Sequence, residues 1–435
     1  MKFKDAKSKI LNIKIIISVL LVGITVAYII SAYLSTISMA KETYSVEAPD
    51  VQINNQNVEK RLKKLISYSI GSKNQNAEEV KPPEISAKAA IVYDLSSERL
   101  LYEKNAVSKV PMASTTKIMT FLIATENCED LYETVTVSRQ AAYTEGSTMH
   151  LAEGETITLH DLLYGLLLNS GNDAAVAIAE HVGGSIEEFC NMMNDRAVSI
   201  GAVNTNFKTP HGLDVDGHYT TAYDLALIAK EAYKQPLYRK IVSTSSIYLN
   251  GHNLKNTNPL LGRYDEVTGG KTGYTGGAGR CIVFYMESGS VQAVAVLLNC
   301  PTSAERVNDS NKLIKYTSQN YNTYTLLSRG TRIDSFAVEK GRAKEVYGII
   351  DDNICITLAK WEEANFDVTY KRNFEKLASP VKYSDILGKI CINWKSGENK
   401  PFEISIDVTA ENSVLRKTYT DHLGDMIKTM PYVMD

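Results

Sequence analysis

The order of β-like and helical runs between residues 85 and 325 constrains the fold of this 435-residue chain more than any other feature. Two β-like runs around Ser96-Ser97 predict a hairpin, and three more follow after more than a hundred residues of helical periodicity. These runs cover residues 88–106, 267–275, 280–288 and 291–300. An antiparallel sheet built from both ends of one domain, with a helical lobe between them, explains this order and predicts an α+β fold.

The helical periods inside this region predict the lobe and a closing helix. Residues 159–184 have the pattern of two helices that join at Ser170 and end at Gly183-Gly184. Further helices are expected over residues 185–201 and 222–235, and the helix that closes the domain is expected over residues 310–327.

Short β-like runs replace the helical periods over residues 326–411 and predict a small, β-rich C-terminal domain. No cluster of reactive side chains accompanies these runs, so a binding or spacing role is expected. Residues 412–435 carry an apolar helical stripe, with Ser413 as a candidate cap and Pro431 as a stop. A peripheral membrane helix and a helix packed on the β-rich domain both fit this stripe. It consists of Leu415, Tyr419, Leu423, Met426 and Met430.

Residues 1–40 have the charge pattern of an export signal. Five lysines and one aspartate precede the apolar residues 15–34. The small residues Ser38 and Ala40 suit a signal peptidase, so a cleaved signal peptide is favoured, although about 20 apolar residues also suffice for an N-terminal membrane anchor. In both cases the remaining chain is expected to be exported and to be associated with the cell wall or the membrane.

Residues 41–84 are polar and are expected to form a linker. A basic amphipathic patch at residues 58–70 interrupts it, with Val58, Leu62, Leu65 and Ile66 on one face. A solvated linker helix is the favoured interpretation of this patch, and contact with the outer membrane surface is the alternative.

The overall composition is that of an ordinary globular protein. A formal net charge of -3 with 22% charged residues gives no reason to expect a nucleic-acid partner. The six cysteines stand singly, and a chain of this size needs no covalent staples, so free and mostly buried thiols are favoured over disulfides. Cys281 with Cys300 and Cys355 with Cys391 are the candidate pairs if any bridge forms.

A serine and a lysine three residues apart, Ser114 and Lys117, begin an otherwise apolar helical run. Residues i and i+3 share a helix face, so the two side chains can meet. A serine hydroxyl needs a neighbouring base to act as a nucleophile at neutral pH, and a lysine is a base only when it is neutral. Burial among apolar side chains and a second nearby cation both lower the pKa of a lysine, so the apolar setting makes Lys117 a candidate general base.

Two further short motifs supply groups that can hold a substrate. Ser170 and Asn172 lie at a turn between two expected helices, where a hydroxyl and an amide can point into a cleft. Lys271 and Thr272 lie on an expected strand and can bind a carboxylate, while Gly273 leaves the strand edge open for a peptide to pair as an extra strand. Each motif alone is weak evidence, but all three in this order are not expected by chance.

The set of three motifs resembles the penicillin-recognising serine enzymes. The closer resemblance is to the low-molecular-mass penicillin-binding proteins, which are serine-type D-alanyl-D-alanine carboxypeptidases. It rests on the motifs "PMASTTKIMT", "LLLNSGNDAAVAIAEHVGG", "TPHGLD" and "GGKTGYTGGAGRC" and covers about residues 85 to 415. The resemblance implies a β-lactamase/transpeptidase-like domain over residues 85–325, peptidoglycan stem peptides as substrates, β-lactam antibiotics as inhibitors, and neither a cofactor nor a metal.

The same resemblance implies a role for each motif residue. Ser114 is the expected nucleophile, Lys117 its general base, and Ser170 the relay of a proton to the leaving group. Asn172 is expected to hold the substrate amide, and the backbone N–H groups of Ser114 and Tyr274 to form the oxyanion hole. The terminal carboxylate of the substrate is expected to bind Lys271, Thr272 and Arg306.

Three alternatives stay open at this point. A class A β-lactamase needs a glutamate that activates water, which residues 187–191 only imitate because they lie in an expected helix. A zinc peptidase could draw on the loop with His211, Asp214, Asp216 and His218, although no His-Glu-x-x-His pair is present. A wall-binding scaffold without activity is the third alternative, and the intact motifs argue against it.

Overall fold

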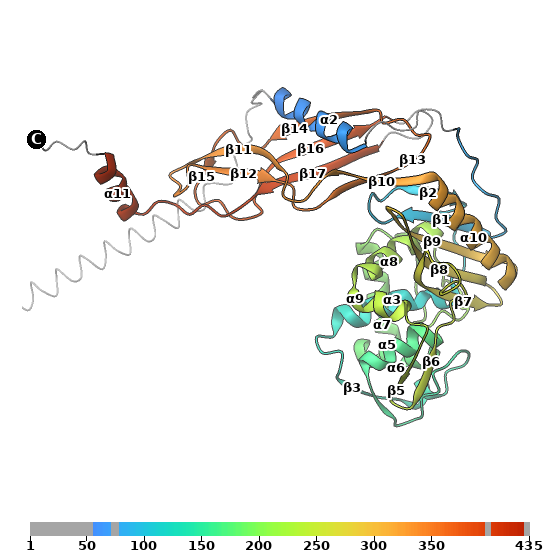
Figure 1. Ribbon diagram of the computed structural model, residues 1–435. Helices are drawn as coiled ribbons and strands as arrows, with labels where there is room; N and C mark the ends of the chain where they lie inside the picture. Colours follow the sequence, from blue (N-terminus) through green and yellow to red (C-terminus); the bar gives the residue numbers. More distant parts are fainter. Residues whose placement is uncertain (1–54, 71–77, 396–401, 430–435) are drawn as a thin grey trace, which may run out of the picture.

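The computed structural model describes residues 55–70, 78–395 and 402–429, which form an α+β domain followed by an elongated β-rich domain (Figure 1). The predicted fold class is confirmed, because an antiparallel sheet with flanking helices and a helical lobe is followed by a β-rich part. Residues 1–40, where a signal peptide or an anchor is expected, lie outside the described residues.

A five-stranded antiparallel sheet forms the centre of the α+β domain, in the order β2-β1-β9-β8-β7. Its first two strands come from the start of the domain and the other three from its end, as the sequence predicts. A tight turn between Ser288 and Val291 joins the last two strands. The strands are β1 (Ala89–Asp94), β2 (Leu100–Lys104), β7 (Val267–Thr275), β8 (Gly279–Ser288) and β9 (Val291–Cys300).

Alternating side chains of this sheet enter two separate apolar clusters, one on each face. Ile91 faces the helical lobe, whereas the next residue, Val92, faces helix α10 (Ser303–Asn320). Helix α8 (Ala222–Lys234) covers the lobe side of the sheet. Because both faces are covered, the central strands are buried almost throughout, which fixes their register.

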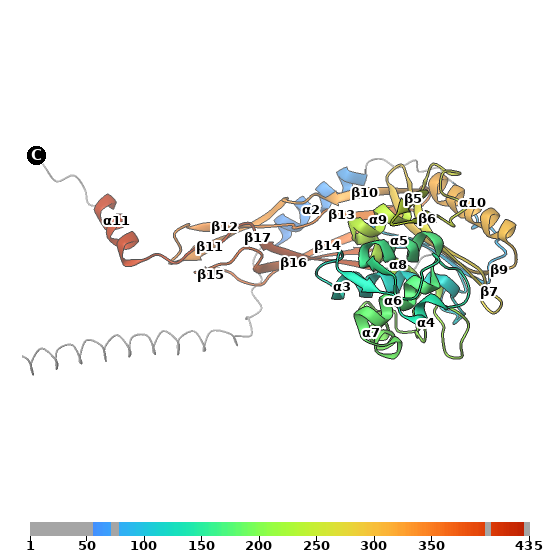
Figure 2. The ribbon, with the colours of Figure 1, turned by 90° about the horizontal axis from the view of Figure 1, so that it is seen from below.

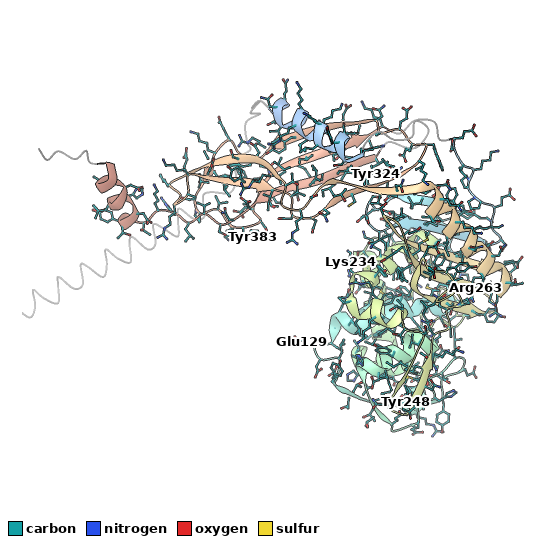
Figure 3. The ribbon with its side chains drawn as sticks, viewed as in Figure 1. Glu129, Lys234, Tyr248, Arg263, Tyr324 and Tyr383 are labelled. Atoms are coloured by element: carbon teal, nitrogen blue, oxygen red, sulfur yellow. The ribbon has the colours of Figure 1, made fainter. Side chains whose placement is uncertain are left out.

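The helical lobe packs below the sheet in Figure 1 and can be followed from another side in Figure 2. Two short two-stranded sheets accompany its helices, and Tyr248, in the second of them, lies at the end of the lobe far from Tyr383 of the β-rich domain (Figure 3). The helices are α3 (Lys117–Asn127), α4 (Arg139–Ala142), α5 (Leu159–Tyr164), α6 (Asn172–Gly183), α7 (Ile186–Ser199) and α9 (Pro236–Val242). The two short two-stranded sheets are β3 (Thr134–Thr136) with β4 (Thr156–Thr158), which helix α4 separates in the chain, and the hairpin of β5 (Ser246–Leu249) with β6 (His252–Lys255).

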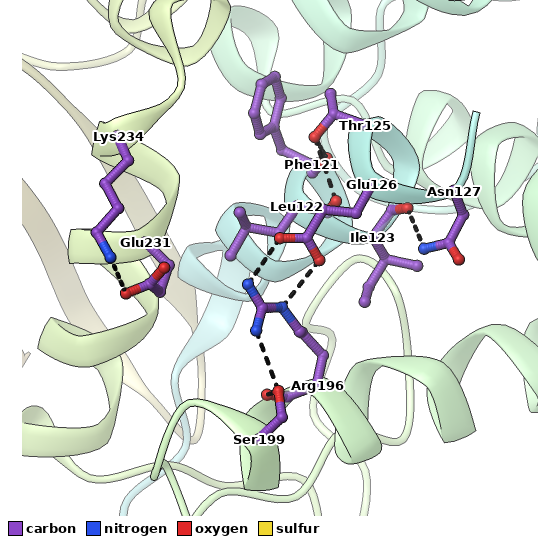
Figure 4. Close-up of polar contacts among 10 residues, drawn as sticks. All are labelled: Phe121, Leu122, Ile123, Thr125, Glu126, Asn127, Arg196, Ser199, Glu231 and Lys234. Carbon is purple, nitrogen blue, oxygen red and sulfur yellow. Dashed lines mark hydrogen bonds and ion pairs between the residues drawn. The ribbon is translucent and has the colours of Figure 1, made fainter. Parts of the chain in front are cut away.

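A bidentate ion pair ties the end of α3 to α7. Both oxygens of Glu126 accept hydrogen bonds from the guanidinium of Arg196 at 2.8 Å, and the same guanidinium reaches Ser199 (Figure 4). Apolar burial along α3, which includes Ile118, Phe121 and Leu122, supplies most of the packing. The helix that begins with Lys117 is therefore held at both its apolar face and its far end.

The β-rich domain contains a two-stranded and a six-stranded sheet. In the first, β10 (Tyr321–Leu327) pairs with β13 (Ile354–Ala359). The prediction of one closing helix over residues 310–327 is therefore wrong beyond Asn320, because residues 321–327 are rich in Tyr and Thr, which favour strands, and gain a strand partner only in the folded chain. The second sheet has the order β14 (Phe366–Arg372), β16 (Ile386–Trp394), β17 (Phe402–Ala410), β12 (Glu345–Ile349), β11 (Arg332–Glu339) and β15 (Leu377–Ala378).

Helix α2 (Gln56–Ile70) packs on this β-rich domain, although it precedes the α+β domain in the chain (Figure 1). Leu62 and Ile66 are fully buried in a cluster that contains Trp394. The carboxylate of Glu59 also accepts a hydrogen bond from the backbone N–H of Tyr370, on the edge strand β14, at 2.9 Å. The interpretation of this segment as a solvated linker helix is therefore wrong, because Leu62 and Ile66 are buried against the β-rich domain, although Leu65 of the same predicted stripe is exposed.

Helix α11 (Tyr419–Thr429) lies at the end of the β-rich domain that is farthest from the α+β domain (Figures 1 and 2). It begins later than predicted, and Thr418 rather than Ser413 precedes its first turn and bonds to Asp421. Leu415, Tyr419 and Leu423 are exposed, so the alternative in which this stripe packs on the β-rich domain is wrong. Within the three described segments, no helix has the length and apolarity needed to cross a membrane.

Candidate active site

A tight helical turn positions Ser114 at the base of the sheet. The 3₁₀ turn Ala113–Thr116 leads directly into α3, so Ser114 and Lys117 fall on the same face, with Nζ of Lys117 3.0 Å from Oγ of Ser114. Ser114 is half-buried, whereas Lys117 is fully buried. The residue before the serine, Ala113, has a φ of 50°, a left-handed conformation that costs free energy for any residue except glycine.

Three oxygen atoms surround the amine of Lys117. Besides the serine hydroxyl, Nζ donates to Oδ1 of Asn172 at 2.7 Å and to the backbone carbonyl of His211 at 2.8 Å. Burial lowers the pKa of Lys117 well below its ordinary value, and the charge of Lys271 lowers it further, against a smaller opposite effect of Asp173. The structure thus brings together the serine, the lysine and the asparagine that the sequence selects.

The turn with Ser170 and Asn172 lies between a π-helical turn (Gly165–Asn169) and α6. Ser170 is buried and has a φ of 61°, so the backbone reverses here and Asn172 becomes the first residue of α6. The amide nitrogen Nδ2 of Asn172 donates to the carbonyl of Glu145 at 2.6 Å, which leaves Oδ1 for Lys117. This hydrogen bond fixes which end of the amide faces the lysine.

Strand β7 forms the opposite wall of the site and is an edge strand of the sheet. Gly273 lies against the serine turn, because a Cβ atom added to it would lie 2.9 Å from the backbone nitrogen of Ser114. Such a contact is too short for a real side chain, so only glycine lets the strand approach this closely. The serine turn therefore packs directly against the backbone of β7.

Lys271 and Thr272 are both buried on β7. Nζ of Lys271 donates to the carbonyl of Thr272 at 2.8 Å, and the Thr272 hydroxyl lies 2.7 Å from that of Thr257. Burial and then the charge of Arg306 lower the pKa of Lys271 to about 7. Arg306, on α10, is itself buried and donates to the carbonyl of Cys281 at 3.3 Å, so it belongs to the same cationic cluster.

Tyr274 follows this cluster on β7 and points outward. Its side chain is 56% exposed, and the guanidinium of Arg280 stacks 3.6 Å from the centre of its ring. The backbone of Tyr274 continues strand β7, which passes Ser114 at Gly273. The side chain forms part of the surface around the entrance.

The segment 209–218 also builds the site, and sequence reasoning gave it no role there beyond a candidate metal loop. The His211 carbonyl binds Lys117, and Gly212 packs on Ala113, where an added Cβ would lie 2.0 Å from the carbonyl oxygen. Asp214 accepts hydrogen bonds from the Thr275 hydroxyl at 2.6 Å and from the Gly277 N–H at 2.9 Å. In the sequence, only the motif "TPHGLD" pointed to this segment. Every residue type has a backbone carbonyl, so the contact of the His211 carbonyl could not be predicted.

Comparison with known proteins matches residues 76–302 to a peptidase family, Peptidase S11, described as D-alanyl-D-alanine carboxypeptidase. The chain is 35% identical over 321 residues to the D-alanyl-D-alanine carboxypeptidase DacF of Bacillus subtilis, an alignment that covers 72% of this chain and 82% of the relative. The chain belongs to the S11 family of D-alanyl-D-alanine carboxypeptidases. It is a serine-type carboxypeptidase and a penicillin-binding protein of the low-molecular-mass class.

This carboxypeptidase is also similar to two further proteins over most of its length. It is 32% identical to DacC of Escherichia coli over 343 residues, which covers 76% of this chain and 86% of that one. Penicillin binding protein 5 from Haemophilus influenzae superimposes with a TM-score of 0.66 at 28% identity, covering 78% of this chain and 100% of that structure. The β-rich domain is therefore part of the shared architecture.

The carboxypeptidase structure also bears on two of the alternatives. Residues 187–191 lie within α7, so the imitation of a β-lactamase glutamate motif is part of a regular helix whose two glutamates, Glu187 and Glu188, are exposed. Asp214 bonds to the turn after β7, while His218 bonds to Thr116, so these candidate zinc ligands have other partners. Across the described segments, no group of three or more His, Cys, Asp or Glu residues could hold a metal ion.

The six cysteines of the carboxypeptidase are free thiols in the structure. Cys190, Cys281 and Cys300 are buried, and burial raises the pKa of each thiol. Cys128, Cys355 and Cys391 are half-buried, so fewer thiols are buried than the sequence suggested.

Proposed function

We propose that this carboxypeptidase removes the terminal D-alanine from peptidoglycan stem pentapeptides through an acyl-enzyme on Ser114, and that β-lactams inhibit it by acylating the same hydroxyl. The observation that carries this proposal is the 3.0 Å approach of the buried Lys117 amine to Ser114. A D-alanyl-D-alanine carboxypeptidase needs a nucleophile with an adjacent base, and this pair supplies both.

The neutral amine of Lys117 acts as the general base. A neutral amine has two N–H donors and one lone pair. Asn172 and the His211 carbonyl accept the two hydrogens, so the lone pair faces the Ser114 hydroxyl. The lowered pKa of Lys117 supports this assignment, because it favours the form that can accept a proton.

Acylation forms the bond between Oγ of Ser114 and the carbonyl carbon of the penultimate D-alanine and breaks its peptide bond to the terminal D-alanine. Lys117 takes the hydroxyl proton, and Ser170 passes a proton to the departing amine. A water molecule then attacks the ester, which releases the shortened peptide and restores Ser114. The backbone N–H groups of Ser114 and Tyr274 stabilise the oxyanion in both steps, a contribution of several kcal/mol to such barriers.

The substrate lies along the open edge of β7 as an additional strand. Lys271, Thr272 and Arg306 bind its terminal carboxylate, and the cationic character of their buried cluster supports this role. Asn172 holds the amide of the substrate, and Gly273 keeps the strand edge free of side-chain atoms. This arrangement selects a peptide with a free C-terminal carboxylate over an internal peptide bond.

The site faces the extracytoplasmic side after export, as the basic and apolar leader indicates. Helix α11 rests on the membrane surface, since Leu415, Tyr419 and Leu423 expose an apolar stripe at the far end of the β-rich domain. A β-lactamase, the alternative of the same fold, differs by rapid hydrolysis of the penicillin adduct. Slow release of a labelled adduct therefore favours the carboxypeptidase.

Release of D-alanine from a synthetic peptide ending in D-alanyl-D-alanine tests the proposal. We expect the Ser114→Ala variant to lose both release and labelling by a fluorescent penicillin, because it removes the hydroxyl that lies 3.0 Å from the Lys117 amine. Ser108→Ala is the control, since Ser108 is exposed on the loop before the site. Release by Ser114→Ala at the wild-type rate would refute the assignment of the nucleophile.

A further inference from the structure

His218 is a buried histidine outside the three motifs, and its ring reaches the turn that carries the nucleophile. Its Nε2 lies 2.9 Å from the hydroxyl oxygen of Thr116, a residue 102 positions earlier in the chain. Its Nδ1 lies 3.0 Å from the backbone nitrogen of Lys208. Only 5% of the residue is exposed, so both contacts are shielded from water.

These contacts define the direction of each hydrogen bond. The Lys208 N–H can only donate, so Nδ1 of His218 accepts and carries no proton. The neutral ring therefore has its proton on Nε2 and donates it to Oγ1 of Thr116. The Thr116 hydroxyl then donates its own proton to the carbonyl of Ala113 at 2.8 Å. Burial lowers the pKa of His218 to about 4, which agrees with a neutral ring.

The end of this chain of hydrogen bonds is the strained residue of the site. Ala113 has a φ of 50°, and its carbonyl is part of the peptide unit whose N–H belongs to Ser114. A carbonyl and the N–H of the same peptide unit are coplanar and point in opposite directions. A hydrogen bond that fixes the Ala113 carbonyl therefore fixes the direction of the Ser114 N–H, one of the two proposed oxyanion donors.

We propose that His218 is a positioning residue for acylation, which holds the Ser114 N–H in its oxyanion-binding direction through the Thr116 hydroxyl and the Ala113 carbonyl. The inference rests on the proposed function, in which Ser114 is the nucleophile. His218 touches no reacting atom, so it acts on the transition state only through the backbone. Its loss affects the rate constant of acylation more than the initial binding of the substrate or inhibitor, because the oxyanion forms only during the reaction.

The rate of acylation by a fluorescent penicillin, measured by stopped flow over a range of concentrations, separates the acylation rate constant from the dissociation constant of the first complex. We expect His218→Ala to lower the rate constant by about 10- to 100-fold, with the dissociation constant within about threefold of the wild type. His218→Gln should recover most of the rate, because an amide can accept from Lys208 and donate to Thr116. His181→Ala is the control, since His181 pairs with Glu133 at the far end of α6 and should leave the rate unchanged.

The Thr116→Val variant provides a second test of the inference, which does not depend on whether the His218→Ala variant folds. It should lower the rate constant as His218→Ala does, and the double variant should be no slower than Thr116→Val alone. An unchanged rate constant in His218→Ala, no recovery in His218→Gln, or additive losses in the double variant would each overturn the inference. Failure of the wild-type protein to be acylated on Ser114 would instead refute the proposed function.

Discussion

The backbone carbonyl of His211 accepts a hydrogen bond from Nζ of Lys117 at 2.8 Å, although the two residues are 94 positions apart. This carbonyl and Oδ1 of Asn172 occupy two directions around the amine and leave the third for Ser114. The proposed base is therefore oriented by a loop and a helix that belong to different parts of the domain.

Gly273→Ala should lower acylation of Ser114 by about 100-fold or more, because the new methyl group would lie 2.9 Å from the Ser114 nitrogen and disturb the oxyanion site. Gly276→Ala is the matched control, since no atom lies within 4 Å of its added Cβ. Labelling with a fluorescent penicillin measures both. Equal labelling of the two variants would show that the strand does not approach the serine as described.

The rate of D-alanine release should fall as the pH rises above about 7. Lys271 binds the substrate carboxylate only when protonated, and its pKa is lowered to about 7 by burial and by Arg306. Lys117 has the opposite requirement, because it acts as a base only when neutral, so its titration contributes a limb that rises with pH. A profile of kcat/KM against pH measures both limbs.

The Lys271→Arg variant separates these two titrations. A guanidinium stays protonated over this range, so the falling limb should disappear even if the maximal rate is lower. Persistence of the same falling limb in Lys271→Arg would assign that titration to another group.

Leu62→Ala should destabilise the β-rich domain by about 3 kcal/mol, because Leu62 is fully buried between α2 and this domain. Leu65→Ala is the control on the same helix, since Leu65 is 42% exposed, and should change stability by less than about 0.5 kcal/mol. Both tryptophans, Trp361 and Trp394, lie in this domain, so urea unfolding followed by tryptophan fluorescence reports on it. Equal midpoints for the two variants would contradict the packing of α2.

Acid should destabilise the α+β domain partly through His211 and His218. Burial lowers their pKa values in the folded protein to about 3 and about 4, whereas an unfolded histidine titrates near 6.5. As the pH falls from about 6.5 toward 4, these two histidines bind protons in the unfolded chain but not in the folded protein. The free energy of unfolding that they contribute above pH 6.5 is therefore lost. The two histidines thus predict a fall in stability below neutral pH.

His218→Gln removes one of these titrations. Between pH 7 and pH 4.5 this variant should lose about 2 kcal/mol less stability than the wild type. His422→Gln is the control, because His422 is exposed on α11. Thermal unfolding followed by circular dichroism over this pH range measures the difference, and parallel curves for all three proteins would contradict a buried, neutral His218.

The sequence was sufficient to predict the central sheet and the three motifs. The strands of the sheet are long enough to show their β pattern, and β7 occupies the predicted residues 267–275. Ser114, Lys117 and Asn172 could be selected because their side chains have the required chemistry and their motifs occur in a fixed order. The structure adds the distances between the side chains of these motifs.

The contacts that the sequence could not predict are those that depend on the backbone or on distant partners. The backbone carbonyl of His211 accepts a hydrogen bond from Lys117, but every residue type has such a carbonyl, so the sequence does not identify this contact. The amphipathic pattern of α2 was visible, but the side chains that bury Leu62 and Ile66 come from strands far later in the chain, such as β10 and β16. Residues 321–327 likewise follow a helix without a break in pattern, and only pairing with β13 makes them a strand.

The reaction of the protein with penicillin tests the central claim, that the neutral Lys117 amine activates Ser114. Mass spectrometry of the intact protein and of its peptides locates and counts the adducts in the wild type and in Lys117→Met, which keeps the apolar packing but has no base. We expect one adduct on Ser114 in the wild type and none in Lys117→Met over the same time. An adduct on another residue, or acylation of Lys117→Met at the wild-type rate, would contradict it.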